Sequence, residues 1–406
     1  MTHYRSLESI PVPKSFLASS SLKRLLLGLC VLGVITFCVG LWADSHRAWS
    51  SYLLNYFYWM SLGLAGVFFT ALQHVTGSVW IAPIRRITEA FGVFLPVSLV
   101  LFLFLFFGLH DLYDWTHLEV VAADPLLQGK APYLNFPFFA FRNIFFLVAW
   151  TVAAYFLLRN SCTQDDTGSV GLTKRNVKIS AIFILFFAIS YTLTGFDLMM
   201  SLEPHWFSTI FGIYCFAGLF LSGLAMITVV VILLKRQGYL PIVNDNHLFD
   251  LGKLMFAFCV FWAYIAFSQF MLIWYSNLPE ETFYLIRRVE GSWRTVSILL
   301  LLSKFIIPFL LLLPATLMRK EGYLLKKAKR IPIEKLMEGD LILENIIYKN
   351  KIIHKKYQSL TRKQLELIKK TNISTIKIKQ GIIFTPAFLI SLIISLIFGN
   401  LFLYLI

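Results

Sequence analysis

Long runs of apolar residues, separated by short polar connections, dominate this chain of 406 residues. Each run approaches the ~20 residues that an α-helix needs to cross ~30 Å of hydrocarbon. Eight of them lie at 24–42, 53–76, 88–110, 136–158, 179–200, 207–234, 250–276 and 295–318, and a ninth at 382–406. Apolar and polar residues do not alternate with period two, which argues against a membrane β-barrel. The pattern predicts an all-α, polytopic transmembrane helical bundle of eight spans plus a ninth, C-terminal hydrophobic helix.

The composition agrees with an integral membrane protein, since 58% of the residues are hydrophobic and the mean hydropathy is +0.71. It also changes along the chain. All ten tryptophans lie before residue 294, whereas residues 319–380 hold 17 Lys or Arg against 6 Asp or Glu. We therefore divide the chain into four parts. They are a cytoplasmic N-terminal segment (1–23), the eight-span bundle (24–318), a basic cytoplasmic segment (319–381) and the C-terminal hydrophobic helix (382–406).

The basic segment is where extended structure is expected. Around 331–356 and 373–379, β-branched residues alternate with polar ones, as they do in strands. A basic tail next to a membrane suits a solvated segment or contact with anionic lipid. Basic density alone does not indicate nucleic acid, so the expected partner is the lipid bilayer and not a nucleic acid.

Loop charge predicts the orientation. The N-terminal segment and every second connection are rich in Lys and Arg, and such loops belong on the cytoplasmic side. These residues are Arg5, Lys14, Lys23, Arg24, Arg85, Arg86, Arg159, Lys174, Arg175, Lys178, Lys235 and Arg236. The N-terminus is then cytoplasmic, and loops 111–135, 201–206 and 277–294 face outward. With residue 318 inside and 319–380 cytoplasmic, the last helix would end outside.

No metal or haem site is expected from the sequence. The five cysteines are scattered, mostly inside spans, and form no CxxC pair, so they read as small buried hydrophobes. A bis-histidine haem would need histidines deep in facing spans, and only His74 lies inside one.

Three segments predicted to face outward hold nearly all of the titratable groups. The first, HDLYDWTHLEVVAAD, includes His117 and Asp124; the second holds Asp197, Glu203 and His205. The third is SQFMLIWYSNLPEE, which includes Gln269. Histidine beside carboxylate suits proton acceptance near neutral pH, as quinol oxidation requires. Nearby aromatic residues would stack a quinone ring or form an ordinary interfacial belt, and the charges could equally sit in water at the span ends.

Other polar residues lie deeper in the predicted spans. Asn55, the Gln73–His74 pair, Arg142 and the Ser268–Gln269 pair could form a proton relay across the bundle. They could also make plain interhelical hydrogen bonds worth about 0.6 kcal/mol each.

Several long strings carry a resemblance to a known family. They are LYDWTH, GKAPYLNFPFFAFRN, FDLMMSLEPHWFSTIFGIYCFAG, LGKLMFAFCVFWAYIAFSQFMLIWYSNLPEE and KFIIPFLLLLP. Over residues 20–318 the chain resembles the second quinone-binding-type membrane subunit of bacterial alternative complex III. That assembly is a quinol:cytochrome c or electron-acceptor oxidoreductase, in the wider group of polysulfide and nitrite reductase membrane subunits.

The resemblance implies a haem-free subunit of a respiratory complex in the bacterial cytoplasmic membrane. Its partners would be haem-bearing and iron–sulfur-bearing subunits and a homologous membrane subunit, and its function menaquinol oxidation with proton handling near the outer face. Asp197, His205 and His117 would accept or relay protons, and Arg142 and Lys253 would balance charge. The remaining candidates for quinone binding or proton relay are Asp124, Glu203, Gln269 and His74. The alternative is a structural or proton-conducting subunit without its own quinone site.

The last part of the chain resembles a different family. The family of the bundle carries about ten spans, whereas this resemblance stops after the eighth. Residues 322–406 are similar to the C-terminal end of archaeal prepilin or preflagellin peptidases, which use two aspartates, one of them in a GxGD motif. Here Met337 and Glu338 precede Gly339–Asp340, so the motif is absent and protease activity is not expected. The two resemblances together suggest a fusion or chimera.

Overall fold

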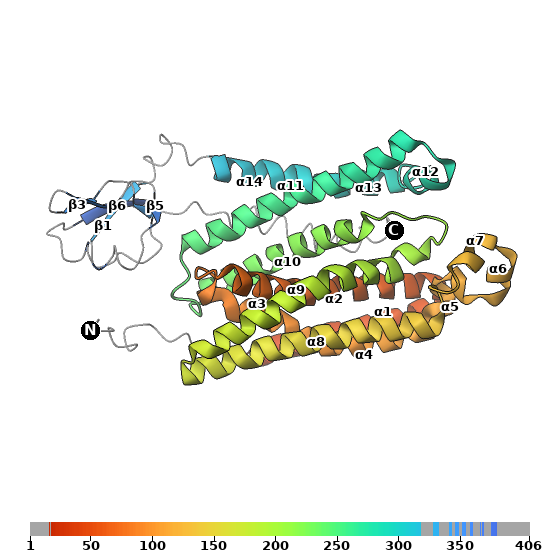
Figure 1. Cartoon of the computed structure of the whole chain (residues 1–406), viewed down its shortest axis with the longest axis horizontal. Helices are drawn as coiled ribbons and strands as arrows, with labels where there is room; N and C mark the ends of the chain where they lie inside the picture. Colours follow the sequence, from red (N-terminus) through yellow and green to blue (C-terminus); the bar gives the residue numbers. More distant parts are fainter. Residues whose placement is uncertain are drawn as a thin grey trace.

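A computed structural model describes residues 16 and 18–317 and parts of the C-terminal segment, namely 328–332, 341–342, 346–348, 351–354, 358–359, 366, 368 and 375–379. Eight helical segments among these residues are long and apolar enough to cross a membrane. They lie side by side in one elongated bundle (Figure 1). The predicted all-α, multi-pass fold is therefore confirmed, and each of the eight apolar runs coincides with one span.

Most spans are single helices. They are α1 (Ser20–Ala43), α2 (Ser45–Thr76), α8 (Phe136–Thr167), α9 (Val170–Leu198), α10 (Phe211–Arg236) and α11 (Asp245–Ser276). The third span is broken into η2 (Ala82–Ile84), α3 (Arg85–Phe91), η3 (Gly92–Phe94), α4 (Leu95–Leu105), η4 (Phe106–Gly108) and α5 (Leu109–Leu112). The eighth combines α13 (Trp293–Leu301), η7 (Leu302–Ile306) and α14 (Ile307–Leu317).

Short elements occupy the connections at one end of the bundle. They are η5 (Asp114–Thr116), α6 (Leu118–Ala123), α7 (Pro125–Lys130), η6 (Met200–Leu202) and α12 (Pro279–Ile286). We call this the α12 end, which lies on the right in Figure 1. The opposite end, here the α3 end, holds the α2–α3, α8–α9 and α10–α11 connections. The two ends correspond to the two sides that the alternation of spans predicts.

Several helices are longer than the apolar runs that predict them because polar residues cap them. The Asp44 carboxylate accepts a hydrogen bond from Arg47 N–H, so α2 begins at Ser45, well before residue 53. The Asn244 side chain starts α11 in the same way, with His247 bonding back to it. Side chains that satisfy the free N–H groups of a first turn stabilise that turn whether or not it lies in the apolar run.

Helices α2 and α10 form the centre of the bundle. In their most apolar windows, 78% and 72% of the residues are buried, against 0% in α1. Glycine allows the close approach of the two helices, because a Cβ built on Gly223 of α10 would lie 2.2 Å from Ala65 Cβ on α2. Gly66 lies equally close to α3, where a Cβ would be 2.6 Å from the Thr88 carbonyl oxygen.

The eighth span contains one turn of π-helix, η7. Cys259 Sγ on α11 donates to the Lys304 carbonyl oxygen at 3.3 Å. This hydrogen bond gives a carbonyl group of the π-helical turn a partner on the neighbouring helix. The Lys304 ammonium is itself buried and donates to Ser222 Oγ on α10 at 3.2 Å.

Short strands occur in the C-terminal segment, where extended structure was predicted. The strands are β1 (Ala328–Pro332), β2 (Leu341–Ile342), β3 (Ile346–Tyr348), β4 (Lys351–His354), β5 (Gln358–Ser359) and β6 (Thr375–Lys379). β1 and β6 pair antiparallel with Ile331 opposite Ile376, and the order in that sheet is β1-β6-β2-β5. β3 and β4 form a separate antiparallel pair. The predicted C-terminal helix at 382–406 lies outside the described residues, as does most of 1–23.

Candidate functional site

The candidate residues do not form one cluster, because they divide between the two ends of the bundle. Residues Arg142, Asp197, Glu203, His205, Asp124 and His117 lie at or near the α12 end. His74 lies near the end of α2 at the α3 end. Lys253 lies eight residues after the start of α11, at the same end, and pairs with Asp250 at 2.7 Å. Lys253 is therefore separated from the α12 end by roughly 34 Å of helix.

A buried ion pair is the centre of the α12 end. Arg142 Nη2 and Nε donate to the two carboxylate oxygens of Asp197 at 2.8 and 3.0 Å. Asn143 Nδ2 adds a third hydrogen bond at 2.9 Å, and the Asp197 side chain is 0% exposed. The guanidinium lies over the rings of Tyr133 and Phe138, at 3.8 and 4.2 Å from their centroids. These contacts join α8 to α9 and to the loop before α8.

Asp197 was predicted to accept or relay protons, and in the structure its carboxylate is already paired with other side chains. Its two oxygens accept three hydrogen bonds, and two of these bonds come from the Arg142 guanidinium in bidentate geometry. The ion pair is well suited to anchoring the end of α9.

A second pair, His205 with Asp124, is open to the surroundings. His205 Nε2 lies 2.6 Å from Asp124 Oδ2, and the two side chains are 53% and 23% exposed. Asp124 also caps α7, where its Oδ1 accepts from Leu126 N–H at 2.8 Å. Partial burial raises the pKa of Asp124, but the hydrogen bonds from Leu126 and His205 outweigh it, so the pKa is lowered. An accessible imidazole beside a charged carboxylate can accept and hold a proton.

The loop that carries Glu203 and His205 is fastened on both sides. Lys130 Nζ donates to the Pro204 carbonyl oxygen at 2.5 Å, and Arg287 Nη1 donates to Glu203 Oε1 at 2.7 Å. Burial lowers the pKa of Lys130. These contacts hold the loop between the 111–135 connection and α12, which keeps His205 against Asp124.

Aromatic stacking reinforces the same loop. The Trp206 and Tyr284 rings stack with centroids 3.6 Å apart, and the Arg288 guanidinium lies 3.2 Å from the Tyr284 centroid. Burial raises the pKa of Tyr284 to about 12, although Arg288 opposes it. The rings are stacked on one another and thus serve here as structural contacts.

His117 lies at the same end but apart from the His205–Asp124 pair. Its Nε2 is 2.8 Å from the His110 carbonyl oxygen, and the two imidazole rings are 5.0 Å apart. Gln269 is buried in the second half of α11, 7% exposed, and no hydrogen bond joins it to the other candidates in the described part of the chain.

Two of the predicted deep polar residues bond within their own helices. Asn55 Nδ2 donates to the Ser51 carbonyl oxygen at 2.8 Å, and Ser268 Oγ donates to that of Tyr264 at 2.8 Å. These contacts are those of ordinary helix residues. Arg142 makes an interhelical contact through Asp197, and residues outside the predicted set make others, such as Ser61 with Tyr191 at 2.9 Å between their hydroxyls.

Three features of the site were not singled out from the sequence. Asn143 completes the Asp197 pair and Lys304 is buried within the eighth span. Arg86 joins Glu89 and Asp165 at the α3 end. A charged or amide residue within an apolar run was the available signal for the first two, since such residues are costly in hydrocarbon.

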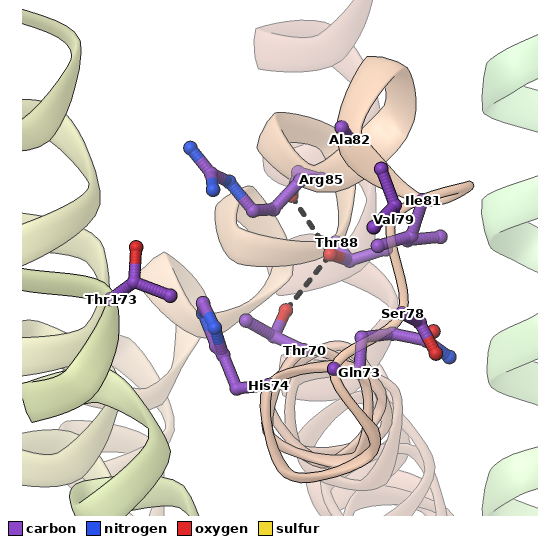
Figure 2. A pocket seen from close by; sticks show the side chains of 11 residues that line it. Thr70, Gln73, His74, Ser78, Val79, Ile81, Ala82, Arg85, Thr88 and Thr173 are labelled. Carbon is purple, nitrogen blue, oxygen red and sulfur yellow. Dashed lines mark hydrogen bonds between the residues drawn. The ribbon is translucent and has the colours of Figure 1, made fainter. Parts of the chain in front are cut away.

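One described cavity lies at the α3 end, with a volume of about 190 Å³ (Figure 2). Its lining includes His74 and Gln73, two of the residues predicted for a relay. Sites for small organic ligands usually exceed about 300 Å³, so this space is too small for a quinone with its tail.

Comparison with known proteins assigns no family to the chain. No protein-family model matches the sequence, and no curated protein matches it either. Within the residues that the structure describes, no group of three or more His, Cys, Asp or Glu side chains could hold a metal ion.

Proposed function

We propose that this chain is an integral membrane subunit of a quinol-oxidising oxidoreductase complex, and that it handles protons at the α12 end. The observation that supports this proposal most is the exposed His205–Asp124 pair, held at 2.6 Å next to the buried Arg142–Asp197 anchor. The resemblance of residues 20–318 to a membrane subunit of alternative complex III gives the redox context. In this proposal the α12 end faces outward and the N-terminus is cytoplasmic.

The described residues fit proton acceptance better than they fit a closed quinone pocket. Oxidation of a bound menaquinol supplies two electrons and two protons. Because Nε2–H donates to the Asp124 carboxylate, His205 Nδ1 would take up a proton, and Asp124 would stabilise the imidazolium that forms. Glu203 and Lys130 hold the loop that presents His205, through Arg287 and Pro204 respectively. The remainder of the quinol site, and the haem and iron–sulfur centres that receive the electrons, would belong to partner subunits.

Substitution of His205 in the assembled complex tests this function. We expect His205→Gln to lower quinol turnover by about 10²-fold or more, the usual contribution of a positioned general base. His46→Gln is the matched control, because His46 is an exposed histidine at the same end of the bundle. Turnover is measured with a soluble electron acceptor, and bound quinone is quantified in the same preparation. Wild-type turnover in His205→Gln and Asp124→Asn would contradict the proposal.

A second function is favoured by a specific observation and stays open to the same experiment. The complete pairing of Asp197 with Arg142 and Asn143 is what a structural subunit without its own quinone site would need. If quinol turnover is unchanged in His205→Gln while proton release to the medium is lost, the chain is a proton-conducting subunit. If both are unchanged while Arg142→Met prevents assembly, its role is structural.

A further inference from the structure

The cavity at the α3 end lies where a phosphate group would meet the membrane. It is enclosed by the end of α2, the turn at 77–81, the start of α3 and the first turns of α9. The turn at 77–81 connects two membrane spans, so it belongs to the boundary between hydrocarbon and headgroups, whichever way the protein is oriented. The cavity of about 190 Å³ is thus at headgroup depth.

Two side chains in the wall of this cavity hold polar atoms that need a partner. Gln73 is only 8% exposed, and its Oε1 has no hydrogen-bond partner among the described residues. The same holds, over the same part of the chain, for His74 Nε2. A buried polar atom without a partner costs about 1–3 kcal/mol, so such atoms commonly mark a bound water, ion or ligand.

Arg85 contributes a guanidinium that its neighbours leave partly unused. Arg86 makes the short hydrogen bonds to Glu89, at 2.9 Å, and to Asp165. Arg85 lies 3.4 and 3.5 Å from the same two carboxylates, beyond good hydrogen-bond distance. Its N–H groups therefore remain able to bond a further acceptor in the cavity that it lines.

Thr173 adds a hydroxyl donor from α9. Its Oγ1 accepts from Gln164 Nε2 at 2.6 Å, which leaves the hydroxyl hydrogen for another acceptor. Figure 2 shows His74, Arg85 and Thr173 on one side of the cavity and Gln73 with Ser78 on the other. Three donor-bearing side chains from three elements thus surround one space, with an amide and a hydroxyl opposite them.

We propose that this cavity binds a phosphate group, through Arg85, Thr173 and His74, independently of the redox function. A guanidinium with neighbouring hydroxyl and imidazole donors matches the acceptor oxygens of a phosphate. The phosphate belongs either to the headgroup of an anionic phospholipid or to free inorganic phosphate. Gln73 Oε1 and Ser78 would accept from a headgroup hydroxyl, and basic pockets between spans are known places for such headgroups.

Lipid titration of the purified, delipidated full chain tests the proposal. Phosphatidylglycerol, phosphatidylcholine and inorganic phosphate are added separately to the protein in mild detergent, and native mass spectrometry counts the bound species. We expect phosphatidylglycerol or phosphate to bind, and Arg85→Gln to weaken that binding by at least about tenfold, as for a lost charged hydrogen bond. Thr173→Val removes one hydroxyl without removing charge and should weaken binding by about threefold.

The control is Lys178→Gln, which removes one positive charge from the same end but lies outside the cavity wall. Its affinity should equal that of the wild type. Competition by inorganic phosphate identifies a free anion as the ligand, and binding of phosphatidylglycerol alone identifies a lipid. Equal binding of phosphatidylglycerol and phosphatidylcholine, or an equal loss in Lys178→Gln and Arg85→Gln, would overturn the proposal. If Arg85→Gln does not fold, unchanged binding in Thr173→Val would overturn it as well.

Discussion

The Arg142–Asp197 pair is the residue-scale contact on which the α12 end depends. Its side chains are 7% and 0% exposed, so removal of one leaves the other charge buried. We expect Arg142→Met or Asp197→Leu alone to destabilise the protein by about 3–5 kcal/mol. The double variant should be less destabilised than either single one, because no lone charge remains. Thermal unfolding in detergent measures the difference.

An exposed ion pair at the same end is the control for this prediction. Arg287 and Glu203 are 63% and 33% exposed, and such pairs contribute about 0–1 kcal/mol. Arg287→Met should therefore leave the unfolding temperature almost unchanged. A double variant as unstable as the sum of its two singles would show that Arg142 and Asp197 do not act as a pair.

The lowered pKa of Asp124 predicts how the stability of α7 depends on pH. The folded pKa lies below the ordinary value of 3.8, because Leu126 N–H and His205 favour the charged form over the effect of burial. An acid whose pKa is lower in the folded than in the unfolded state stabilises the fold above its unfolded pKa. That contribution is lost as the pH falls through the folded pKa. The first turn of α7 should thus be fully closed above about pH 4 and open only as the pH falls through the lower, folded pKa.

Hydrogen exchange of the Leu126 amide, corrected for the intrinsic rate at each pH, measures this opening. The Asn135 cap of α8 provides the internal control, since its amide oxygen accepts from Phe138 N–H at 3.0 Å and does not titrate. Protection of Phe138 should be constant over the same range. Loss of protection at both caps together would indicate general acid unfolding and not titration of Asp124.

At this scale the sequence singled out charged residues of the α12 end but not how they pair. Asp197, His205 and Asp124 were found because charged residues near the ends of apolar runs are rare. The pairing depends on how four segments meet. Asp197 pairs with Arg142, which is 55 residues away, and His205 pairs with Asp124, which is 81 residues away. Single-sequence patterns carry no such distances, so His205 and Asp197 were expected to act together.

At the scale of elements, close helix contacts depend on glycine. Gly223→Leu places a side chain where Ala65 Cβ already lies within 2.2 Å of an added Cβ. The α2–α10 contact must then separate, at a cost of about 1–3 kcal/mol or more. Gly28→Leu in α1 is the matched control, because an added Cβ there has no described atom within 4 Å. Folded yield and unfolding temperature in detergent should fall for Gly223→Leu alone. An equal fall for Gly223→Leu and Gly28→Leu would exclude packing as the cause.

Helix existence was predictable at this scale, but the breaks within helices were not. Each span needs about 20 apolar residues, which is a property of the sequence alone. The start of α2 depends on the Asp44 cap, and the π-turn at Leu302–Ile306 has partners on α10 and α11. The hydrogen bonds from Cys259 and Lys304 that accompany this turn arise only once the helices are packed.

At the scale of the whole molecule, the two ends differ in charge, and this predicts which end faces the cytoplasm. Eleven Lys or Arg residues of the described bundle lie in or near the connections of the α3 end and six in or near those of the α12 end. The eleven are Lys23, Arg24, Arg85, Arg86, Arg159, Lys174, Arg175, Lys178, Lys235, Arg236 and Lys253, and the six are Arg47, Lys130, Arg142, Arg287, Arg288 and Arg294. The positive-inside rule then predicts that the α3 end faces the cytoplasm and that the His205–Asp124 pair lies outside.

Thiol labelling in intact cells tests this orientation with residues that the structure places at opposite ends. Cys162 is exposed near the end of α8, at the α3 end, and Glu119 lies in α6, at the α12 end. A membrane-impermeant maleimide should label Glu119→Cys in a background without Cys162, and should reach Cys162 only after the membrane is opened. The reverse pattern of labelling would place His205 on the cytoplasmic side, where protons released from it could not contribute to an outward proton gradient.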